Sequence, residues 1–361
     1  MSNYYLILIW VAFFAVLQSF VRMKRTEVVC GKKEYRMKKE WAFLLFLPLI
    51  IWSMDRGNVG DTYSYIKMFE DIPGGFSNIA SYMTTVIKDK AFYFVSAIIK
   101  AVVGNRVKLY FLIIALIQAM LLIRVYRKYS FNYVISFFLF IASTDYISWM
   151  FNGIRQFVAV TITFACFELI LEKKYKKAII GIIFAALFHG SALLVLPFIF
   201  VCQGRAWNRK TVLFIVAVLV VVMYVNQFTD ILENLLAETQ YENVVSDWKM
   251  WEDDGTNILR VLVYSVPAML SLIGLKYIRR ADNPVVNICT NMSIVAAGIY
   301  VVSMFTSGIF IGRLPIYFSL YSYILLPWEI ENMFESKSAR IIYLLMIVGY
   351  IGFYFVGISS V

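Results

Sequence analysis

Two arginines stand where polar turns meet long apolar runs, and a charge in such a place is a candidate functional group. Arg155 lies in Asn152-Gly153-Ile154-Arg155-Gln156, and Arg313 lies in Ile311-Gly312-Arg313-Leu314-Pro315. A guanidinium keeps its charge and can hold a phosphate through two parallel hydrogen bonds. Both arginines are therefore candidates for binding an anion, with Asn152 and Gln156 as supports for Arg155. The alternative for Arg155 is an interfacial arginine that reaches toward lipid headgroups.

His189 is the only histidine of the chain, and it lies in Phe188-His189-Gly190-Ser191, halfway along the apolar run Ala178–Val201. An imidazole can take a proton from a hydroxyl near neutral pH, so His189 is a candidate general base. The alternative is a structural histidine whose hydrogen bonds are satisfied by its neighbours. One histidine cannot build a multi-histidine metal site. The four scattered cysteines suggest neither a disulfide framework nor a zinc site.

Asp61 lies in Gly60-Asp61-Thr62-Tyr63-Ser64-Tyr65, where a carboxylate stands beside two tyrosines. Such a group could hold sugar hydroxyls through hydrogen bonds and ring stacking. The alternative is that Asp61 caps a helix from Thr62 to Asp71. A second aromatic segment, Asp230–Asp254, is acidic and predicts an amphipathic helix over the bundle or, as a lesser alternative, a platform for a glycan.

Several common motifs are absent from the sequence. It contains no P-loop, GxGxxG, GxSxG or HExxH pattern, and no spaced pair of aspartates for a nucleotide-sugar metal. ATP-driven transport and metal-dependent transfer from nucleotide sugars therefore have no support.

The elements that position these residues must lie in a membrane. Of the 361 residues, 61% are hydrophobic and 16% are charged, against about 45–50% and 25% in an average soluble domain. This composition excludes a water-soluble globular enzyme, a disordered protein and a nucleic-acid binder. A spanning helix needs about 20 apolar residues, and lipid tolerates only helices or closed barrels. The sequence therefore predicts an all-α polytopic membrane protein, a single bundle of about 11–12 transmembrane helices over residues 1–361.

Charged loops predict which side of the membrane each segment faces. The segment Arg22–Glu40, with eight basic and three acidic residues, is typical of a cytoplasmic loop. Such loops hold much of the net charge of +11, so this charge does not indicate a nucleic-acid partner. Residues about 55–90 and 227–257 are then external, as are the turns that carry Arg155 and Arg313.

Two points of topology stay open at this stage. The run Ala91–Val103 is the shortest candidate, and it does not cross fully if Arg124–Lys128 is cytoplasmic. The run Ala178–Val201 is either one span or two half-helices of a re-entrant hairpin, broken at His189.

Taken in order, these motifs resemble the EpsG-like family of bacterial membrane proteins, which is related to Wzy-type polysaccharide polymerases. The segments that carry the resemblance are Gly60 to Tyr65, Asn152 to Gln156, Lys173–Lys177, Phe188 to Ala192 with Leu196-Pro197, and Arg313 with Tyr317-Phe318. One segment departs from the family pattern: it reads Lys88-Asp89-Lys90-Ala91, and no carboxylate is assigned a role there.

The resemblance implies a metal-independent membrane glycosyltransferase that makes an exopolysaccharide or capsule, with its active site facing outside at the bacterial cytoplasmic membrane. The growing glycan would leave undecaprenyl pyrophosphate and pass to a hydroxyl of the next lipid-linked unit. Arg155 and Arg313 would grip the pyrophosphate, and His189 would take the proton. Asp61, Tyr63 and Tyr65 would orient the sugar. No metal or cofactor is expected; membrane lipid, a flippase and a chain-length regulator are the expected partners.

Two other functions use the same residues. A lipid-linked glycan ligase would transfer existing chains to another acceptor without lengthening them. A flippase or transporter would bind the pyrophosphate without chemistry, and should show broken helices in both halves of the chain.

Overall fold

The computed structural model describes residues 3–236, 246, 250 and 255–359, and the chain divides into two compact units. Unit 1 consists of Met1–Leu193 and Glu335–Val361, and unit 2 consists of Leu194–Phe334. The prediction of one transmembrane domain over residues 1–361 stays a prediction. Most of the acidic segment Asp230–Asp254, including its aromatic residues, lies outside the described residues.

Unit 1 is helical apart from one hairpin. Its elements are α1 (Asn3–Leu17), β1 (Lys24–Val29), β2 (Lys32–Met37), α2 (Lys39–Trp52), η1 (Ser53–Asp55), α3 (Thr62–Asp71), η2 (Phe76–Asn78), α4 (Ile79–Thr85), α5 (Lys90–Val103), α6 (Val107–Tyr129), α7 (Tyr133–Ala142), the π-helical segment η3 (Tyr146–Asn152), α8 (Ile154–Ala165), α9 (Phe167–Leu171), α10 (Tyr175–Ala186), the start of η4 (Gly190–Leu194) and α20 (Ser336–Ile358).

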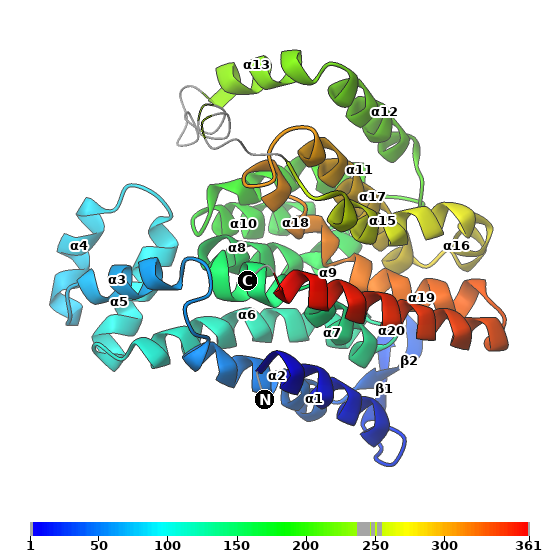
Figure 1. Cartoon of the computed structure of the whole chain (residues 1–361), viewed down its shortest axis with the longest axis horizontal. Helices are drawn as coiled ribbons and strands as arrows, with labels where there is room; N and C mark the ends of the chain where they lie inside the picture. The colour runs from blue at the N-terminus through cyan, green and yellow to red at the C-terminus, as the bar shows by residue number, and fades with distance from the viewer. Residues whose placement is uncertain (1–2, 237–245, 247–249, 251–254, 360–361) are drawn as a thin grey trace. The chain divides into compact units, whose positions relative to one another are not determined.

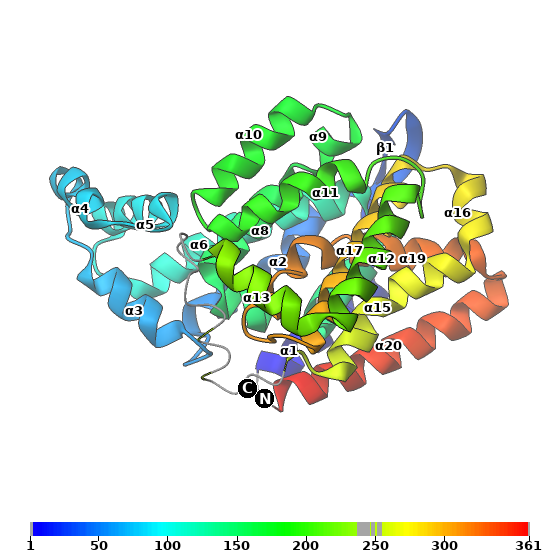
Figure 2. The ribbon, with the colours of Figure 1, turned by 90° about the horizontal axis from the view of Figure 1, so that it is seen from above.

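The centre of unit 1 is α6, which packs against α2 on one side and α8 on another. Helix α8 in turn packs against α10, so that it lies between α6 and α10 (Figure 1). The helices α3, α4 and α5 form a group beside the N-terminal end of α6 (Figure 2). This arrangement brings the start of α8, the start of α5 and the N-terminal part of α3 to one region of the unit.

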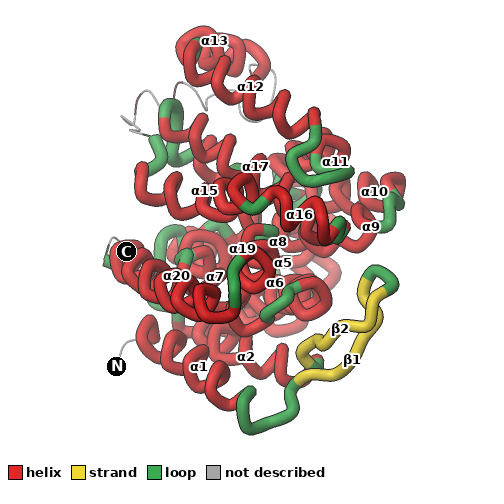
Figure 3. The backbone as a smooth tube through the Cα atoms, turned by 90° about the vertical axis from the view of Figure 1, so that its right-hand side faces the viewer, coloured by secondary structure: helices red, strands yellow, loops and turns green. Residues whose placement is uncertain are grey.

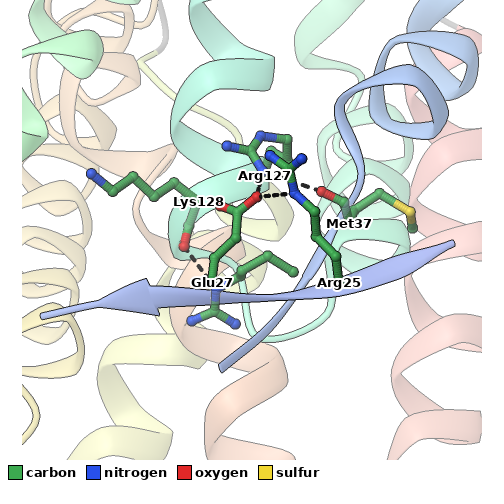
Figure 4. Close-up of polar contacts among 6 residues, drawn as sticks. Arg25, Glu27, Met37, Arg127 and Lys128 are labelled. Atoms are coloured by element: carbon green, nitrogen blue, oxygen red, sulfur yellow. Dashed lines mark hydrogen bonds and ion pairs between the residues drawn. The ribbon is translucent and has the colours of Figure 1, made fainter. Parts of the chain in front are cut away.

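The segment Arg22–Glu40, predicted as a basic loop, contains an antiparallel β-hairpin (Figure 3). Cys30 and Gly31 both have positive φ, as a tight two-residue hairpin turn requires. The buried Arg36 side chain donates from Nε to the Lys128 carbonyl, at 2.8 Å, at the end of α6. Glu27 accepts from Arg25 at 2.6 Å and from Arg127 at 2.7 Å (Figure 4). Arg36 and Arg127 therefore link the hairpin to α6 through hydrogen bonds. The number of basic residues in the segment does not by itself predict these contacts.

The described residues of unit 2 form helices joined by loops, without a strand. Its elements are α11 (Val195–Val201), α12 (Arg209–Met223), α13 (Val225–Leu236), α15 (Ile258–Ile273), α16 (Leu275–Ala281), α17 (Pro284–Met304), η5 (Ile311–Arg313), α18 (Ile316–Ser319) and α19 (Ser322–Met333). Helix α17 is its centre and contacts α12, α15, α18 and α19. In both units asparagine side chains cap helix starts by accepting a backbone N–H, at α7, α12, α15 and α17.

The helices confirm the prediction of an all-α polytopic membrane protein. Among the described residues, four helices are long and apolar enough to cross a membrane: α6, Ile154–Leu171, α17 and α20. The number rises to seven if each of three sharply bent helix pairs is one span, and two further apolar helices, Asn3–Leu17 and Gly190–Val201, are shorter than these. The predicted count of about 11–12 spans is higher. The most apolar stretch of α20 is only 17% buried, so its Ile341, Leu344 and Val348 side chains suit contact with lipid rather than water.

These helices bear on the two open points of topology. The predicted break at His189 is confirmed, because α10 ends at Ala186 and η4 begins at Gly190. The re-entrant hairpin stays a prediction. Helix α5 has 14 residues and is not one of the helices that could span a membrane, in agreement with a run that does not cross.

Candidate functional site

Arg155 is held by a buried carboxylate from a distant part of the chain. It is the second residue of α8, directly after η3 and Gly153. Its Nη1 donates to Asp89 Oδ2 at 2.9 Å. The Arg155 side chain is 38% exposed, whereas that of Asp89 is 8% exposed. The guanidinium is thus fixed by a carboxylate of low exposure, while more than a third of the Arg155 side chain stays exposed.

Asp89 is the residue that the sequence did not assign. It adopts a left-handed conformation, with φ of 52°, directly before α5. Burial raises the pKa of the Asp89 carboxyl, and the nearby Arg155 opposes this shift. The sequence does contain a signal for Asp89. It is a carboxylate at the start of an apolar run, and a charge in such a position made Arg155 and Arg313 candidate functional residues. Because Asp89 stands between Lys88 and Lys90, the segment is basic overall in the sequence.

Tyr65 and Tyr63, predicted to act together, face different surroundings. Tyr65 is 7% exposed and forms a side-chain hydrogen bond with Arg155. Tyr63 is 68% exposed. Residues two apart on a helix point to nearly opposite sides, which accounts for this difference. Tyr65 therefore belongs to the surroundings of Arg155, and Tyr63 does not.

The Asp61 segment is joined to the start of α8 by a contact that includes Asn152. The Asp61 backbone N–H donates to Asn152 Oδ1 at 2.9 Å. Gly60 has φ of 50°, and a Cβ added there would lie 2.3 Å from the same oxygen, so glycine is required. The side chain of Asp61 makes no capping hydrogen bond to α3. The helix Thr62–Asp71 of the helix-cap alternative is present and Asp61 stands at its N-cap position, but the Asp61 carboxylate does not cap it, and Asn152 positions the Asp61 segment. Gln156 is buried on α8.

His189 lies in the break between α10 and η4, half-buried. Its Nδ1 is 2.7 Å from Ser191 Oγ. The Ala91 N–H donates to the Leu187 carbonyl at 3.0 Å. Ala91 stands two positions after Asp89, and Leu187 stands two positions before His189. The hydrogen bond therefore holds the Asp89 segment next to the His189 break. Unit 1 thus brings together Asp89, Arg155, Tyr65 and the His189 break, from four separate segments.

An apolar cavity of about 310 Å³ adjoins these residues. Phe92, Val158 and Phe188 line it, and each stands within three positions of Asp89, Arg155 or His189. The remaining lining residues are also apolar and come from α5, α6, α8 and α10. A cationic group and an apolar cavity therefore lie side by side, which suits a ligand with an anionic head and an apolar chain.

Arg313 lies in unit 2, at the end of η5, and is exposed. Gly312 beside it is buried, and an added Cβ would lie 2.5 Å from Thr256 Oγ1. This close approach fixes the backbone that carries Arg313. The joint grip of Arg155 and Arg313 on one pyrophosphate stays a prediction.

Among the described residues, no group of three or more histidine, cysteine, aspartate or glutamate side chains could hold a metal ion. No curated protein and no solved structure matches the chain. A family model described as the EpsG family matches residues 40–361. Because this match covers far more than half of the sequence, the chain belongs to the EpsG family.

Proposed function

We propose that this protein polymerises lipid-linked oligosaccharide repeat units into an exopolysaccharide or capsule. It would transfer the glycan from undecaprenyl pyrophosphate to a sugar hydroxyl at the outer face of the cytoplasmic membrane. Membership of the EpsG family, which is associated with Wzy-type polymerase-like membrane proteins, supports this class of reaction. The observation that carries the proposal is the half-exposed Arg155, paired with the buried Asp89 beside the break that holds His189.

The reaction needs charge stabilisation more than covalent help, because a lipid pyrophosphate already leaves well. The acceptor hydroxyl forms a bond to the anomeric carbon, and the bond from that carbon to the pyrophosphate oxygen breaks. The electron pair leaves with the pyrophosphate, where Arg155 stabilises the developing charge. In the tautomer whose Nδ1–H donates to Ser191 Oγ, His189 Nε2 would carry the lone pair that takes the acceptor's proton.

The apolar cavity accounts for the carrier lipid. A polyprenyl chain is apolar along its whole length, and burying its first isoprene units in the cavity of about 310 Å³ beside Arg155 would anchor the pyrophosphate at the cation. Asp61 would contact the sugar from the segment that Asn152 holds.

Asp89→Asn should lower polymer formation about tenfold. This is the lower end of the free energy that a hydrogen bond between charged groups contributes, because solvent screens the Arg155 side chain, which is 38% exposed. The raised pKa of Asp89 means that it takes up a proton at a higher pH than an exposed aspartate. Its pair with Arg155 is therefore lost as the pH falls through that value. In rate measurements from neutral to acidic pH, the original protein should lose rate through both His189 and Asp89, so Asp89→Asn should show a shallower acid limb that keeps only the His189 contribution. Asp89→Glu should restore part of the activity, and an unchanged acid limb in Asp89→Asn would contradict the assignment.

Arg313→Ala should abolish long polymer while the protein still inserts in the membrane, because the leaving group would lose one of its two proposed cations. Arg279→Ala, which removes an exposed arginine on α16 of the same unit, is the matched control and should leave polymer length unchanged. Polymer of normal length from Arg313→Ala would remove this residue from the site.

The proposal itself is tested by incubating the purified protein with lipid-linked repeat unit and separating the products by length. A ladder of longer lipid-linked chains supports a polymerase. Transfer of existing chains without lengthening indicates a ligase instead. Movement of the substrate across a vesicle membrane with no new glycosidic bond indicates a transporter.

A further inference from the structure

Arg56 is a buried cation that the catalytic proposal does not use. It follows η1 directly and is 5% exposed. Within the described part of the chain, its Nε and Nη2 are buried without a hydrogen-bond partner. Its guanidinium carbon lies 3.7 Å from the centre of the Phe111 ring, which holds it in place. Burying a charge without a hydrogen-bonded counter-charge is costly, so this arginine suits an anionic ligand.

Arg56 remains a cation at neutral pH. Burial lowers its pKa to about 10, and the nearby Tyr65 hydroxyl opposes this shift. The positive charge is therefore present when a ligand arrives.

A cavity of about 500 Å³ lies at Arg56, between the segment after α2, the start of α3 and the start of α6. Its charged lining residues are Arg56, Lys108 and Asp55, and Lys108 pairs with Asp55 at 2.5 Å. One positive charge, that of Arg56, is left without compensation. This balance matches a ligand group with a single negative charge.

The remaining lining suits a sugar. Tyr63 and Phe111 offer aromatic faces, and Asn58 and Thr62 offer an amide and a hydroxyl. The Thr62 hydroxyl donates to the Val59 carbonyl at 2.6 Å, so its oxygen can accept a hydrogen bond from a sugar hydroxyl.

The cavity adjoins the Arg155 region through one short segment. Residues 58–65 supply Asn58, Thr62 and Tyr63 to the cavity, whereas Asp61 and Tyr65 of the same segment contact Asn152 and Arg155. Tyr65 interacts with both arginines. A glycan that extends from a pyrophosphate at Arg155 would pass along this segment.

We propose that this cavity is a subsite for an acidic sugar of the glycan, whose carboxylate pairs with Arg56 while its ring packs against Tyr63. The inference rests on the proposed function, since it names one sugar class of that substrate. A carboxylate brings the single negative charge that the lining requires, and a hydrogen bond from a guanidinium to a carboxylate is strong because both groups are charged.

The test is direct binding to the purified full-length protein in detergent, by titration calorimetry, with methyl glucuronide as the probe. The uncharged methyl glucoside, glycerol phosphate and inorganic pyrophosphate are the comparison ligands. Methyl glucuronide should bind at least about tenfold more tightly than methyl glucoside. Arg56→Gln should remove this preference, a loss of about tenfold or about 1.4 kcal/mol. Arg106→Gln, an exposed arginine at the start of α6, is the matched control and should keep the preference.

Several outcomes overturn the inference, and one further variant separates the loss of the Arg56 charge from misfolding. Equal binding of the two glycosides, or an unchanged preference in Arg56→Gln, shows that Arg56 does not read a sugar carboxylate. Binding of glycerol phosphate through Arg56 as tight as that of the glucuronide assigns the cavity to a phosphate headgroup. Arg56→Lys, which keeps the charge, shows whether a loss comes from charge or from misfolding, since it should retain part of the preference. Failure of glucuronide binding beside intact lengthening of lipid-linked chains overturns the subsite alone, and pyrophosphate binding reports on Arg155 separately.

Discussion

Arg155→Ala is expected to lower polymer formation by about 10²- to 10³-fold, the effect typical of removing a group that stabilises developing charge in a transition state. Its guanidinium is the half-exposed cation that the buried Asp89 carboxylate fixes beside an apolar cavity. Both the binding of the pyrophosphate and the stabilisation of its departure would be lost. The measurement is the rate at which lipid-linked chains lengthen in detergent or vesicles.

The control for this variant is Arg340→Ala, an exposed arginine on α20 of the same unit, which should lengthen chains at the original rate. Arg155→Lys should recover only a small part of the activity, because an ammonium cannot make two parallel hydrogen bonds to phosphate oxygens. Both variants should insert in the membrane in normal amount. Normal lengthening by Arg155→Ala would show that Arg155 is an interfacial arginine, as the alternative from the sequence holds.

His189→Ala is expected to lower the rate of chain lengthening by about 10²- to 10⁴-fold, the usual contribution of a general base. The effect should fall on kcat rather than on KM for the lipid-linked donor, because Arg155 and the apolar cavity are left intact. In the original protein the rate should fall on acidification, since a protonated imidazole cannot accept a proton. His189→Ala should lack the part of this dependence that comes from the imidazole.

Two features of the chain sharpen this test. His189 is the only histidine, so a protein labelled with ¹⁵N-histidine gives one imidazole, whose protonation can be followed and compared with the rate. Ser191→Ala removes the hydroxyl 2.7 Å from Nδ1 and should lower the rate less than His189→Ala does. An identical acid limb in the rate of His189→Ala would assign the base to another group, with Asp61 the first to examine.

Local features of this protein could be read from the sequence. The apolar composition determines that lipid is the solvent, because no soluble interior could hold so much apolar surface. The helix break at His189 was visible because histidine, glycine and serine interrupt one apolar run. Arg155 stands out because it is a charge where a polar turn meets an apolar run, and Asp61 stands out because it is a carboxylate near two tyrosines.

Only the tertiary structure decided which of these residues act together. Asp89 and Arg155 are 66 positions apart, and Asp61 and Asn152 are 91 apart, so the packing of α3 and α5 beside α6 and α8 creates both contacts. Tyr63 and Tyr65 form one motif in the sequence, yet helix geometry turns them toward different surroundings. Arg56 is one arginine among many until its burial against Phe111 leaves it without a counter-charge. Sequence determines residue types and local breaks, since these depend on neighbours along the chain. Pairing and burial depend on neighbours in space, which the packing of the helices supplies.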